Sequence, residues 1–547
     1  MEEQVPLSTS PSRATALDIE VSDAKENLFT AYNDTYTPND DTYAARFLPK
    51  HIVDKLYPTN VPRAVQLLRK ENIAVPACYL CVGLLQGLSG PFINVYPRFL
   101  EATEAQQATI SSIRSLPASF KLIFGFFSDN VPFLGYRRKA YMFIGWAMSS
   151  AAMFVLLSMS TLERVEQQDN DGNTSFIPPE DAPSIGLLSL SLLVFGIGFW
   201  FADVMGDSIV AEKAKLEPEH TRGHLQSTCY ACRFFGLMIA APVSTYLYST
   251  FGPKLIVTLM CITPCAMLIP IFNLYEVRYA EIKSTRDQCN EIWNTVCSRA
   301  VWQPMGFVYI YNCLQVGNQA WREFLMSVLL FTEFQMNILL IVAYVLLYVG
   351  VMAYKYYFIR FSWRTIYVGT TILNGFLSLL QVLLIEGITF GLSPFVFALG
   401  DDIFADFIAG VQFLPTTIMM VHLCPSGTEG SSYAMFTTVN NCAGGVAYAI
   451  STMLLGIWDV SKETMLSGDL SGMTKLTLLT TALQTAGIFF VKLLPNTKEE
   501  LAGLHSGTYS GSKIGGFIFL SVVLLSVLYA IGVSLLTIAF PGLLGES

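Results

Sequence analysis

The amino-acid sequence predicts an all-α polytopic membrane protein built from two six-helix halves and an extra C-terminal helix. The first observation is composition: 52% of the 547 residues are hydrophobic and only 14% are charged, whereas soluble domains carry about 25% charged residues. The second is that the apolar residues form blocks of about 20, the length that crosses a bilayer core as an α-helix. The third is that these blocks divide evenly around one long polar connection.

Each hydrophobic block is expected to be a helix, because backbone groups in hydrocarbon find no water and must bond within their own segment. The blocks lie at 73–93, 106–127, 140–160, 185–208, 225–249, 255–275, 302–320, 338–358, 365–385, 395–421, 431–455, 476–491 and 514–540. Six precede and six follow the polar connection, which is the division of the major facilitator fold, and one more is appended.

The block pattern divides the chain into five parts. We interpret residues 1–72 as a disordered cytoplasmic tail, since they are polar and acidic. The others are an N-terminal six-helix half at 73–275, a cytoplasmic linker at 276–301, a C-terminal six-helix half at 302–495, and an extra transmembrane helix with a tail at 496–547.

The distribution of Lys and Arg predicts a cytoplasmic N-terminus, because cytoplasmic connections are enriched in these residues. The connections placed inside (51–72, 128–139, 209–224, 276–301, 354–364, 422–430 and 492–513) carry 20 of them, and the alternating connections (94–105, 161–184, 250–254, 321–337, 386–394 and 456–475) carry 6. The outside connection 161–184 contains the sequon Asn173-Thr174-Ser175, a glycosylation candidate. The plasma membrane is the default location.

Composition also argues against several kinds of partner. A net charge of −9 gives no reason to expect nucleic acid. The pairs Cys78/Cys81 and Cys229/Cys232 lie in apolar blocks, where Cys is a small packing residue, so we expect no metal site. We expect a monomer in a lipid bilayer that binds a small solute and needs no cofactor other than a coupling ion, H⁺.

Charged side chains inside the apolar blocks are the strongest functional signal. Each is costly in a membrane and is therefore expected to face the bundle interior or a water-filled cavity and to find a partner there. We assign Arg114, Lys121 and Arg233 to binding an anionic solute, and Asp203, Asp207, Asp402 and Asp406, with Asp401 beside them, to carrying protons. The structural alternative is that these groups pair with one another and only hold helices together.

The connection between the second and third blocks predicts a gate. Asp129 follows one helix, and Arg137 and Arg138 precede the next. Such a network can lock two helices on the cytoplasmic face, and breaking it would give alternating access a two-state element.

Two stretches resemble the signature of the folate–biopterin transporter family, a branch of the major facilitators. The first is Pro117-x-x-x-Lys121-x-x-x-Gly125-x-x-Ser128-Asp129-x-x-Pro132-x-x-Gly135-Tyr136-Arg137-Arg138, and the second is Ala202-Asp203-Val204-x-x-Asp207-x-x-x-x-Glu212 with Gly223-x-Leu225-Gln226-Ser227 and Arg233-x-x-Gly236. The resemblance implies that Lys121, Asp203, Asp207 and Arg233 carry charges needed for transport and that Asp129, Arg137 and Arg138 form the inner gate. Arg114 is inferred from helix geometry alone.

The expected function is therefore proton-coupled secondary transport (symport) of a small organic anion such as folate or biopterin by alternating access. Ala118 and Leu122 depart from the family pattern beside the solute face, which leaves open a carrier of another metabolite, for example S-adenosylmethionine, or a transport-dead sensor. An enzyme is not expected. An intramembrane aspartyl protease would need Gly-x-Gly-Asp, and both Gly400-Asp401 and Gly206-Asp207 lack the first glycine.

Overall fold

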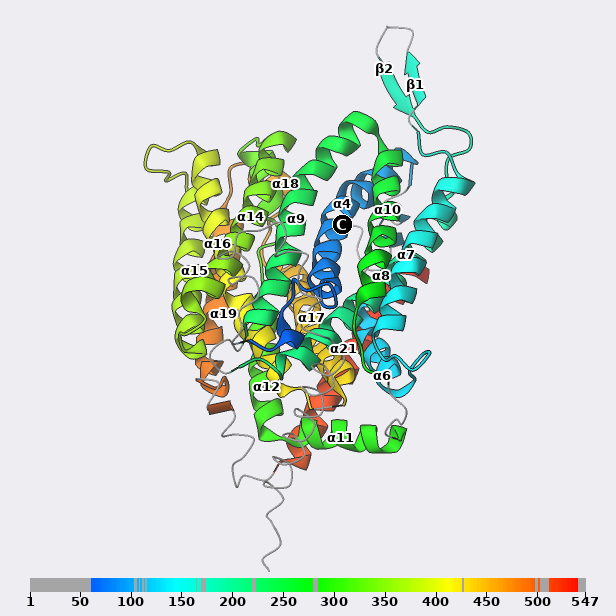
Figure 1. Cartoon of the computed structure of the whole chain (residues 1–547). Helices are drawn as coiled ribbons and strands as arrows, with labels where there is room; N and C mark the ends of the chain where they lie inside the picture. Colours follow the sequence, from blue (N-terminus) through cyan, green and yellow to red (C-terminus); the bar gives the residue numbers. More distant parts are fainter. Residues whose placement is uncertain are drawn as a thin grey trace, which may run out of the picture.

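A computed structural model shows a bundle of long helices with a β-hairpin at one end and a surface helix, α11, at the other (Figure 1). We call these the hairpin end and the linker end. The structure describes residues 61–102, 106–107, 109–110, 113, 116–163, 165–168, 174–218, 223–278, 284–425, 427–496, 500–501 and 511–539. Within them, ten helices are long and apolar enough to cross a membrane. This confirms the all-α polytopic class.

The six blocks of the first half form one run of helices, the N-half. They are α4 (Ala74–Phe99), the 3₁₀ helix η3 (Leu116–Phe120) with α6 (Lys121–Asn130), α7 (Lys139–Met159), α8 (Ile185–Ala214), α9 (His224–Phe251) and α10 (Pro253–Asn273). The break at η3 follows from Pro117, whose ring and missing N–H disfavour a continuous α-helix.

The blocks of the second half form the C-half. They are α12 (Arg299–Cys313), α13 (Trp321–Glu323) with η5 (Phe324–Val328), α14 (Glu333–Ala353) with η6 (Tyr354–Phe358), α15 (Trp363–Ile385), α16 (Pro394–Leu423), α17 (Glu429–Leu454), α18 (Lys462–Leu466) and α19 (Ser471–Ala486) with η7 (Gly487–Leu493). The linker contains α11 (Thr285–Cys297), and the appended block is α21 (Lys513–Ala539).

The same helix pairs pack together in both halves. Helix α4 packs against α9 as α12 packs against α17, and α7 contacts α8 and α10 as α15 contacts α16 and α19. Between the halves, α6 packs against α17 and α9 packs against α14, which are equivalent pairs in the repeat. Repeated packing of this kind is characteristic of transporters built from two related halves.

Residues 61–72 are not the disordered tail that the sequence predicts. They contain the short helix η2 (Arg63–Val65), and the buried Lys213 at the end of α8 donates to the side chain of Asn72 (2.9 Å) and to the Ala64 carbonyl (3.2 Å). Glu71 pairs with Arg63 at 2.6 Å. A buried ammonium needs acceptors, and this segment supplies them. Residues 1–60 lie outside the described residues.

A short antiparallel hairpin is a local exception to the all-helical prediction. Strand β1 (Val165–Gln168) pairs with β2 (Thr174–Ile177), with Val165 opposite Ile177. β-Branched residues in both strands favour this pairing. The glycosylation candidate Asn173 lies outside the described residues.

Candidate functional site

Four of the charged residues singled out in the apolar blocks lie together inside the N-half. Lys121 on α6 donates from Nζ to Oδ2 of Asp203 on α8 at 2.8 Å, and Arg233 on α9 donates from Nη1 to Oδ1 of the same carboxylate at 3.2 Å. Asp207 lies one turn further along α8. We call Lys121, Asp203, Asp207 and Arg233 the charge cluster.

A close approach of two helices places Arg233 in the cluster. At Gly83 on α4, a Cβ atom would lie 1.9 Å from the carbonyl oxygen of Arg233, so only glycine lets α9 come this near. The guanidinium then reaches Asp203 and also donates from Nε to Oε1 of Gln86 on α4 at 3.3 Å.

The two cations of the cluster differ in exposure. The Lys121 side chain is 5% exposed, and its ammonium lies 4.4 Å from the ring centroid of Trp200, so it sits between a carboxylate and an indole face. The Arg233 side chain is 12% exposed. Its Nε donates to Gln86 and its Nη1 donates to Asp203. Arg233 therefore keeps N–H groups beyond the bonds to Gln86 and Asp203.

Asp207 is held by a tyrosine rather than by a cation. The Tyr79 hydroxyl on α4 donates to Oδ1 of Asp207 at 2.5 Å, and the Tyr79 ring meets the Tyr230 ring edge-to-face at 5.2 Å. The Tyr230 hydroxyl lies 3.2 Å from that of Tyr433 on α17, to which Gln226 donates at 2.8 Å. This row of side chains connects the charge cluster to the C-half.

The structure does not bring the remaining predicted site residues into the cluster. Asp406 is partly exposed on α16, and the described residues provide it with no hydrogen bond or ion pair. Asp401 and Asp402 lie on the same helix, but their side chains are outside what the structure describes. Arg114 lies outside the described residues.

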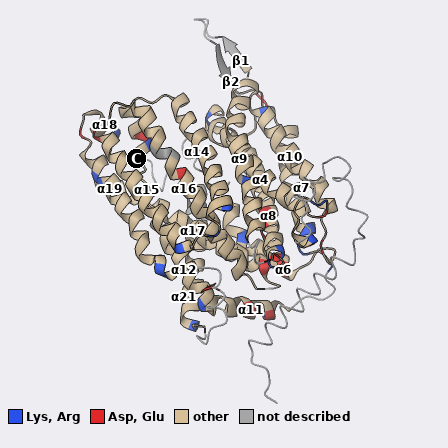
Figure 2. Cartoon of the chain, turned by 60° about the vertical axis from the view of Figure 1, so that its left-hand side comes forward, with Lys and Arg blue, Asp and Glu red and all other residues tan. Residues whose placement is uncertain are grey.

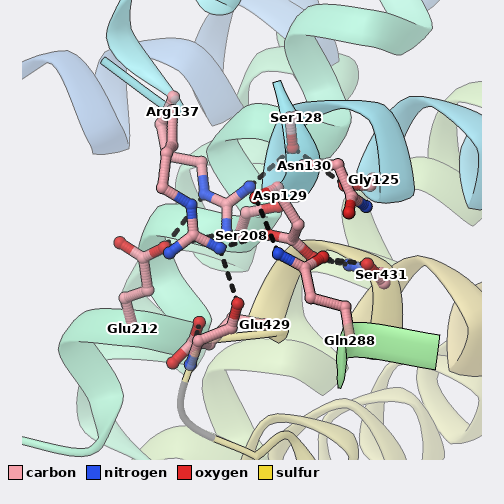
Figure 3. A network of polar contacts seen from close by, with 12 residues as sticks. Gly125, Ser128, Asp129, Asn130, Arg137, Ser208, Glu212, Gln288, Glu429 and Ser431 are labelled. Atoms are coloured by element: carbon pink, nitrogen blue, oxygen red, sulfur yellow. Dashed lines mark hydrogen bonds and ion pairs between the residues drawn. The ribbon is translucent and has the colours of Figure 1, made fainter. Parts of the chain in front are cut away.

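The three predicted gate residues meet at the linker end. Figure 3 shows Asp129 and Arg137 among their partners. Asp129, at the end of α6, accepts from Nη2 of Arg137 at 2.9 Å and from Nη2 of Arg138 at 2.5 Å. Its second oxygen accepts from the backbone N–H of Ser431 at 2.7 Å and from the Ser431 hydroxyl. A carboxylate of the N-half thus caps α17 of the C-half, where unpaired N–H groups and the helix dipole favour negative charge.

Arg138 is fully buried and bonds in three directions. Its guanidinium donates to Glu212 at the end of α8 (2.9 Å), to the Ser128 hydroxyl (2.6 Å) and to Asp129. Its backbone N–H, with those of Arg137 and Lys139, donates to the carboxylate of Glu276, which follows α10. The start of α7 is therefore positioned from two sides.

Further bonds join the halves at this end. Lys215 pairs with Glu429 on α17 at 2.5 Å, and Arg137 donates to the carbonyl of Gly427 at 2.6 Å. We call this set the gate network: Asp129, Arg137, Arg138, Glu212, Lys215, Glu429 and Ser431. In Figure 2, segments coloured for acidic and basic residues lie beside α6 at the linker end.

Two glycines let α6 and α17 approach closely enough for the gate network to form. A Cβ atom on Gly125 would lie 2.4 Å from the carbonyl oxygen of Gly430, and one on Gly430 would lie 2.7 Å from Nη1 of Arg138 and 3.0 Å from Oδ1 of Asp129. Gly430 thus leaves the space in which the ion pair sits.

Replacing Gly430 by alanine is expected to lower the free energy of unfolding by about 1–3 kcal/mol, because the added methyl group overlaps a guanidinium that has no room to move. Denaturant unfolding of the purified protein measures this. Gly444→Ala on the same helix is the matched control, since a Cβ there meets nothing within 4 Å. Equal unfolding midpoints for the two variants would contradict the steric argument.

Sequence reasoning placed Asp129, Arg137 and Arg138 in the gate but missed most of their partners. Glu212 was visible as one of the motif residues of the second family-like stretch. Ser431, Lys215 and Glu276 carried no separate signal, because a polar residue beside a membrane helix is ordinary.

The chain matches the model of the BT1 family over residues 94–169 and 174–504. It is 25% identical over 404 residues to the folate-biopterin transporter of Synechocystis sp. (strain ATCC 27184 / PCC 6803 / Kazusa), covering 72% of this chain and 77% of that protein. It is 21% identical over 496 residues to folate transporter 1 of Plasmodium falciparum (isolate 3D7), covering 90% and 92% of the two chains.

Solved structures show the same fold at low identity. The major facilitator superfamily proton:xylose symporter superposes with a TM-score of 0.57 at 14% identity, covering 80% of this chain and 98% of the symporter. A bacterial homologue of the iron transporter ferroportin gives a TM-score of 0.53 at 12% identity, covering 78% of this chain and all of that one. The predicted major facilitator fold is confirmed.

Proposed function

This chain belongs to the BT1 family and is a multi-pass membrane transporter rather than an enzyme. We propose that it is a secondary transporter that moves a folate-like or pterin-like anion together with protons. The family match confirms the resemblance seen in the sequence. The names of the relatives support the solute class, since those proteins are described as folate or folate–biopterin transporters.

An anionic solute is supported by the different surroundings of the two buried cations, Lys121 and Arg233. Lys121 is enclosed by Asp203 and Trp200, so its role is to position the carboxylate. Arg233 is the more exposed cation and has donors beyond those given to Asp203 and Gln86. A carboxylate of the solute would bind the remaining guanidinium N–H groups in the bidentate geometry that Arg favours.

The charge balance of the cluster supports coupling to protons through Asp207. With both carboxylates ionised, the four side chains sum to zero, and with Asp207 protonated they carry one positive charge. A solute carboxylate then finds a compensated site when Asp207 holds a proton. Asp203 accepts hydrogen bonds from two cations, Lys121 and Arg233, which favour its ionised form. Asp207 accepts a hydrogen bond from the Tyr79 hydroxyl instead. Asp402 and Asp406 on α16 are proposed as further proton carriers.

The gate network supports alternating access. It joins the two halves at the linker end by bonds from Asp129 on α6 and from Lys215 at the end of α8 to the first turn of α17. These bonds must break when that end opens. We propose that the linker end and the N-terminus are cytoplasmic, as the Lys and Arg distribution predicts. We also propose that the protein resides in the plasma membrane and works as a monomer.

One uptake panel tests the proposal. Cells that express the chain are offered labelled folate, biopterin and S-adenosylmethionine, with and without a proton ionophore. We expect folate or biopterin uptake above that of vector-only cells and its loss with the ionophore. Uptake of S-adenosylmethionine alone would replace the solute assignment, uptake that ignores the ionophore would contradict proton coupling, and binding without flux would contradict carriage.

Asp207→Asn is expected to flatten the pH dependence of uptake, because asparagine keeps the shape but cannot exchange a proton. The titratable groups around this carboxyl are Cys78 and Tyr79 on α4, Lys121 on α6, Asp203 on α8, Cys229, Tyr230 and Arg233 on α9, Cys424 after α16, and Tyr433 on α17. Initial uptake rates across a pH series measure the effect. The exposed Asp181→Asn is the control and should keep the wild-type profile. An unchanged profile in Asp207→Asn would remove this residue from the coupling path.

A further inference from the structure

The appended helix α21 docks at its start on the junction between α11 and α12. The backbone N–H of Ser512 donates to the carbonyl of Cys297 at 2.9 Å. A Cβ atom on Gly516 would lie 2.6 Å from Sγ, 3.0 Å from Cα and 3.1 Å from N of Cys297, and one on Gly515 would lie 3.1 Å from the Trp302 ring. A side chain at position 516 would therefore force Cys297 or the neighbouring backbone to shift, and glycine permits the close contact without that shift.

Further along, α21 presents one buried face to the bundle. Phe519, Val523 and Ser526 are buried and are spaced four and three residues apart, so they lie on one side of the helix. Ser526 hydrogen-bonds the Tyr309 hydroxyl on α12 at 3.0 Å. Helix α21 packs against α12 and α17 of the C-half and also against η3 of the N-half. It thus contacts both halves next to the α6–α17 seam.

Helix α11 connects this docking site to the gate network. Gln288 near its start is 1% exposed and donates from Nε2 to the backbone carbonyl of Asp129 at 3.1 Å. Cys297 at its other end is buried and lies against the start of α21. Helix α11 therefore links the backbone of the gate residue Asp129 to the appended helix.

We propose that α11 and α21 form a clamp that holds the linker end closed and sets how readily it opens. Opening must separate α6 from α17, and α21 spans the neighbouring seam by contacting η3 and α17 together. Opening must also release Gln288 from Asp129 or move α11 with the N-half, away from its docking site on α21. The clamp proposal rests on the proposed function in one respect: it assumes that the linker end opens during transport. It does not depend on which solute is carried.

Labelling of a buried gate cysteine tests the clamp without any solute. Cys424 follows α16 at the linker end and is 5% exposed. In a parent protein whose other ten cysteines are replaced by alanine, a membrane-impermeant maleimide applied from the linker end labels Cys424 only when this end opens. The backbone of residue 297 remains, so the contact with Gly516 persists in the parent.

Gly516→Leu is expected to raise the Cys424 labelling rate about fivefold, the effect of weakening the closed state by roughly one hydrogen bond. Gly532→Leu on the same helix is the matched control, since a Cβ there meets nothing within 4 Å, and it should label like the parent. Gln288→Leu removes the other end of the clamp while keeping the size of the side chain, and it should raise the rate by a similar factor.

The outcomes separate the clamp from the transport proposal. If Gly516→Leu does not elute as a monodisperse protein, Gln288→Leu decides the question alone. If a monodisperse Gln288→Leu variant labels at Cys424 at the same rate as the parent, the clamp proposal is overturned, whatever the result for Gly516→Leu. This holds even if the protein takes up solute efficiently. Faster labelling in a protein that carries none of the tested solutes would support the clamp and leave only the proposed function refuted.

Discussion

Arg138→Ala is expected to lose about 3–5 kcal/mol of unfolding free energy and nearly all transport, because it removes one partner from a buried ion-pair network. The guanidinium is fully buried, and its loss leaves Asp129 and Glu212 with one cation fewer in a low-dielectric site. Without it, Asp129 also loses the bond that orients it toward the start of α17. Denaturant unfolding and labelled-solute uptake measure the two effects.

Two companion variants define the origin of the Arg138 effect. Arg278→Ala removes an exposed cation near the same helix start, one whose Nε donates to the Tyr136 hydroxyl, and should change stability little. Arg138→Lys should fail to rescue, since one ammonium cannot reach Ser128, Asp129 and Glu212 as the planar fork does. Wild-type stability in Arg138→Ala would refute the importance of the network.

Asp203→Asn is the second change with a large expected effect. Asp203 is the carboxylate that both Lys121 and Arg233 contact, so its neutralisation leaves two buried cations facing the single carboxylate of Asp207. We expect a loss of about 3–5 kcal/mol in unfolding free energy and uptake at background. Unfolding in detergent and uptake at matched surface expression measure these effects.

A double variant distinguishes charge balance from solute binding at Asp203. Lys121→Met with Asp203→Asn removes one cation and one anion, leaving Arg233 and Asp207 balanced, so most of the lost stability should return. Uptake should not return, because the positioned carboxylate is still absent. A double variant as unstable as Asp203→Asn alone would show that shape rather than charge governs this site.

Most of the fold was predictable from the sequence because a membrane imposes one requirement on every spanning segment. Blocks of about 20 apolar residues must close their own hydrogen bonds, so their helical form follows from length and composition. The six-plus-six division then predicted the two halves, and the structure shows equivalent helix pairs in both. The hairpin at 165–177 and the ordered segment at 61–72 were missed, because short polar segments carry no such requirement.

The charge cluster was predictable residue by residue but not as an arrangement. Lys121, Asp203, Asp207 and Arg233 were identified because a charge in an apolar block is costly and must find a partner. That Asp203 is shared by both cations while Asp207 faces Tyr79 depends on how α4, α6, α8 and α9 meet. The approach of α9 to α4 depends in turn on Gly83, one glycine among 39.

The sequence by itself determined that the chain spans a membrane, that it has two helical halves and which charged residues lie among its apolar segments. These properties are local, since each depends on residues within about one helix length. The tertiary structure alone decided that Asp129 caps α17, that Gly430 leaves room for Arg138, and that Gln288 and Gly516 connect the linker and the appended helix. Those contacts join residues far apart in the chain, and their energy depends on distances of a few ångströms that no local pattern encodes.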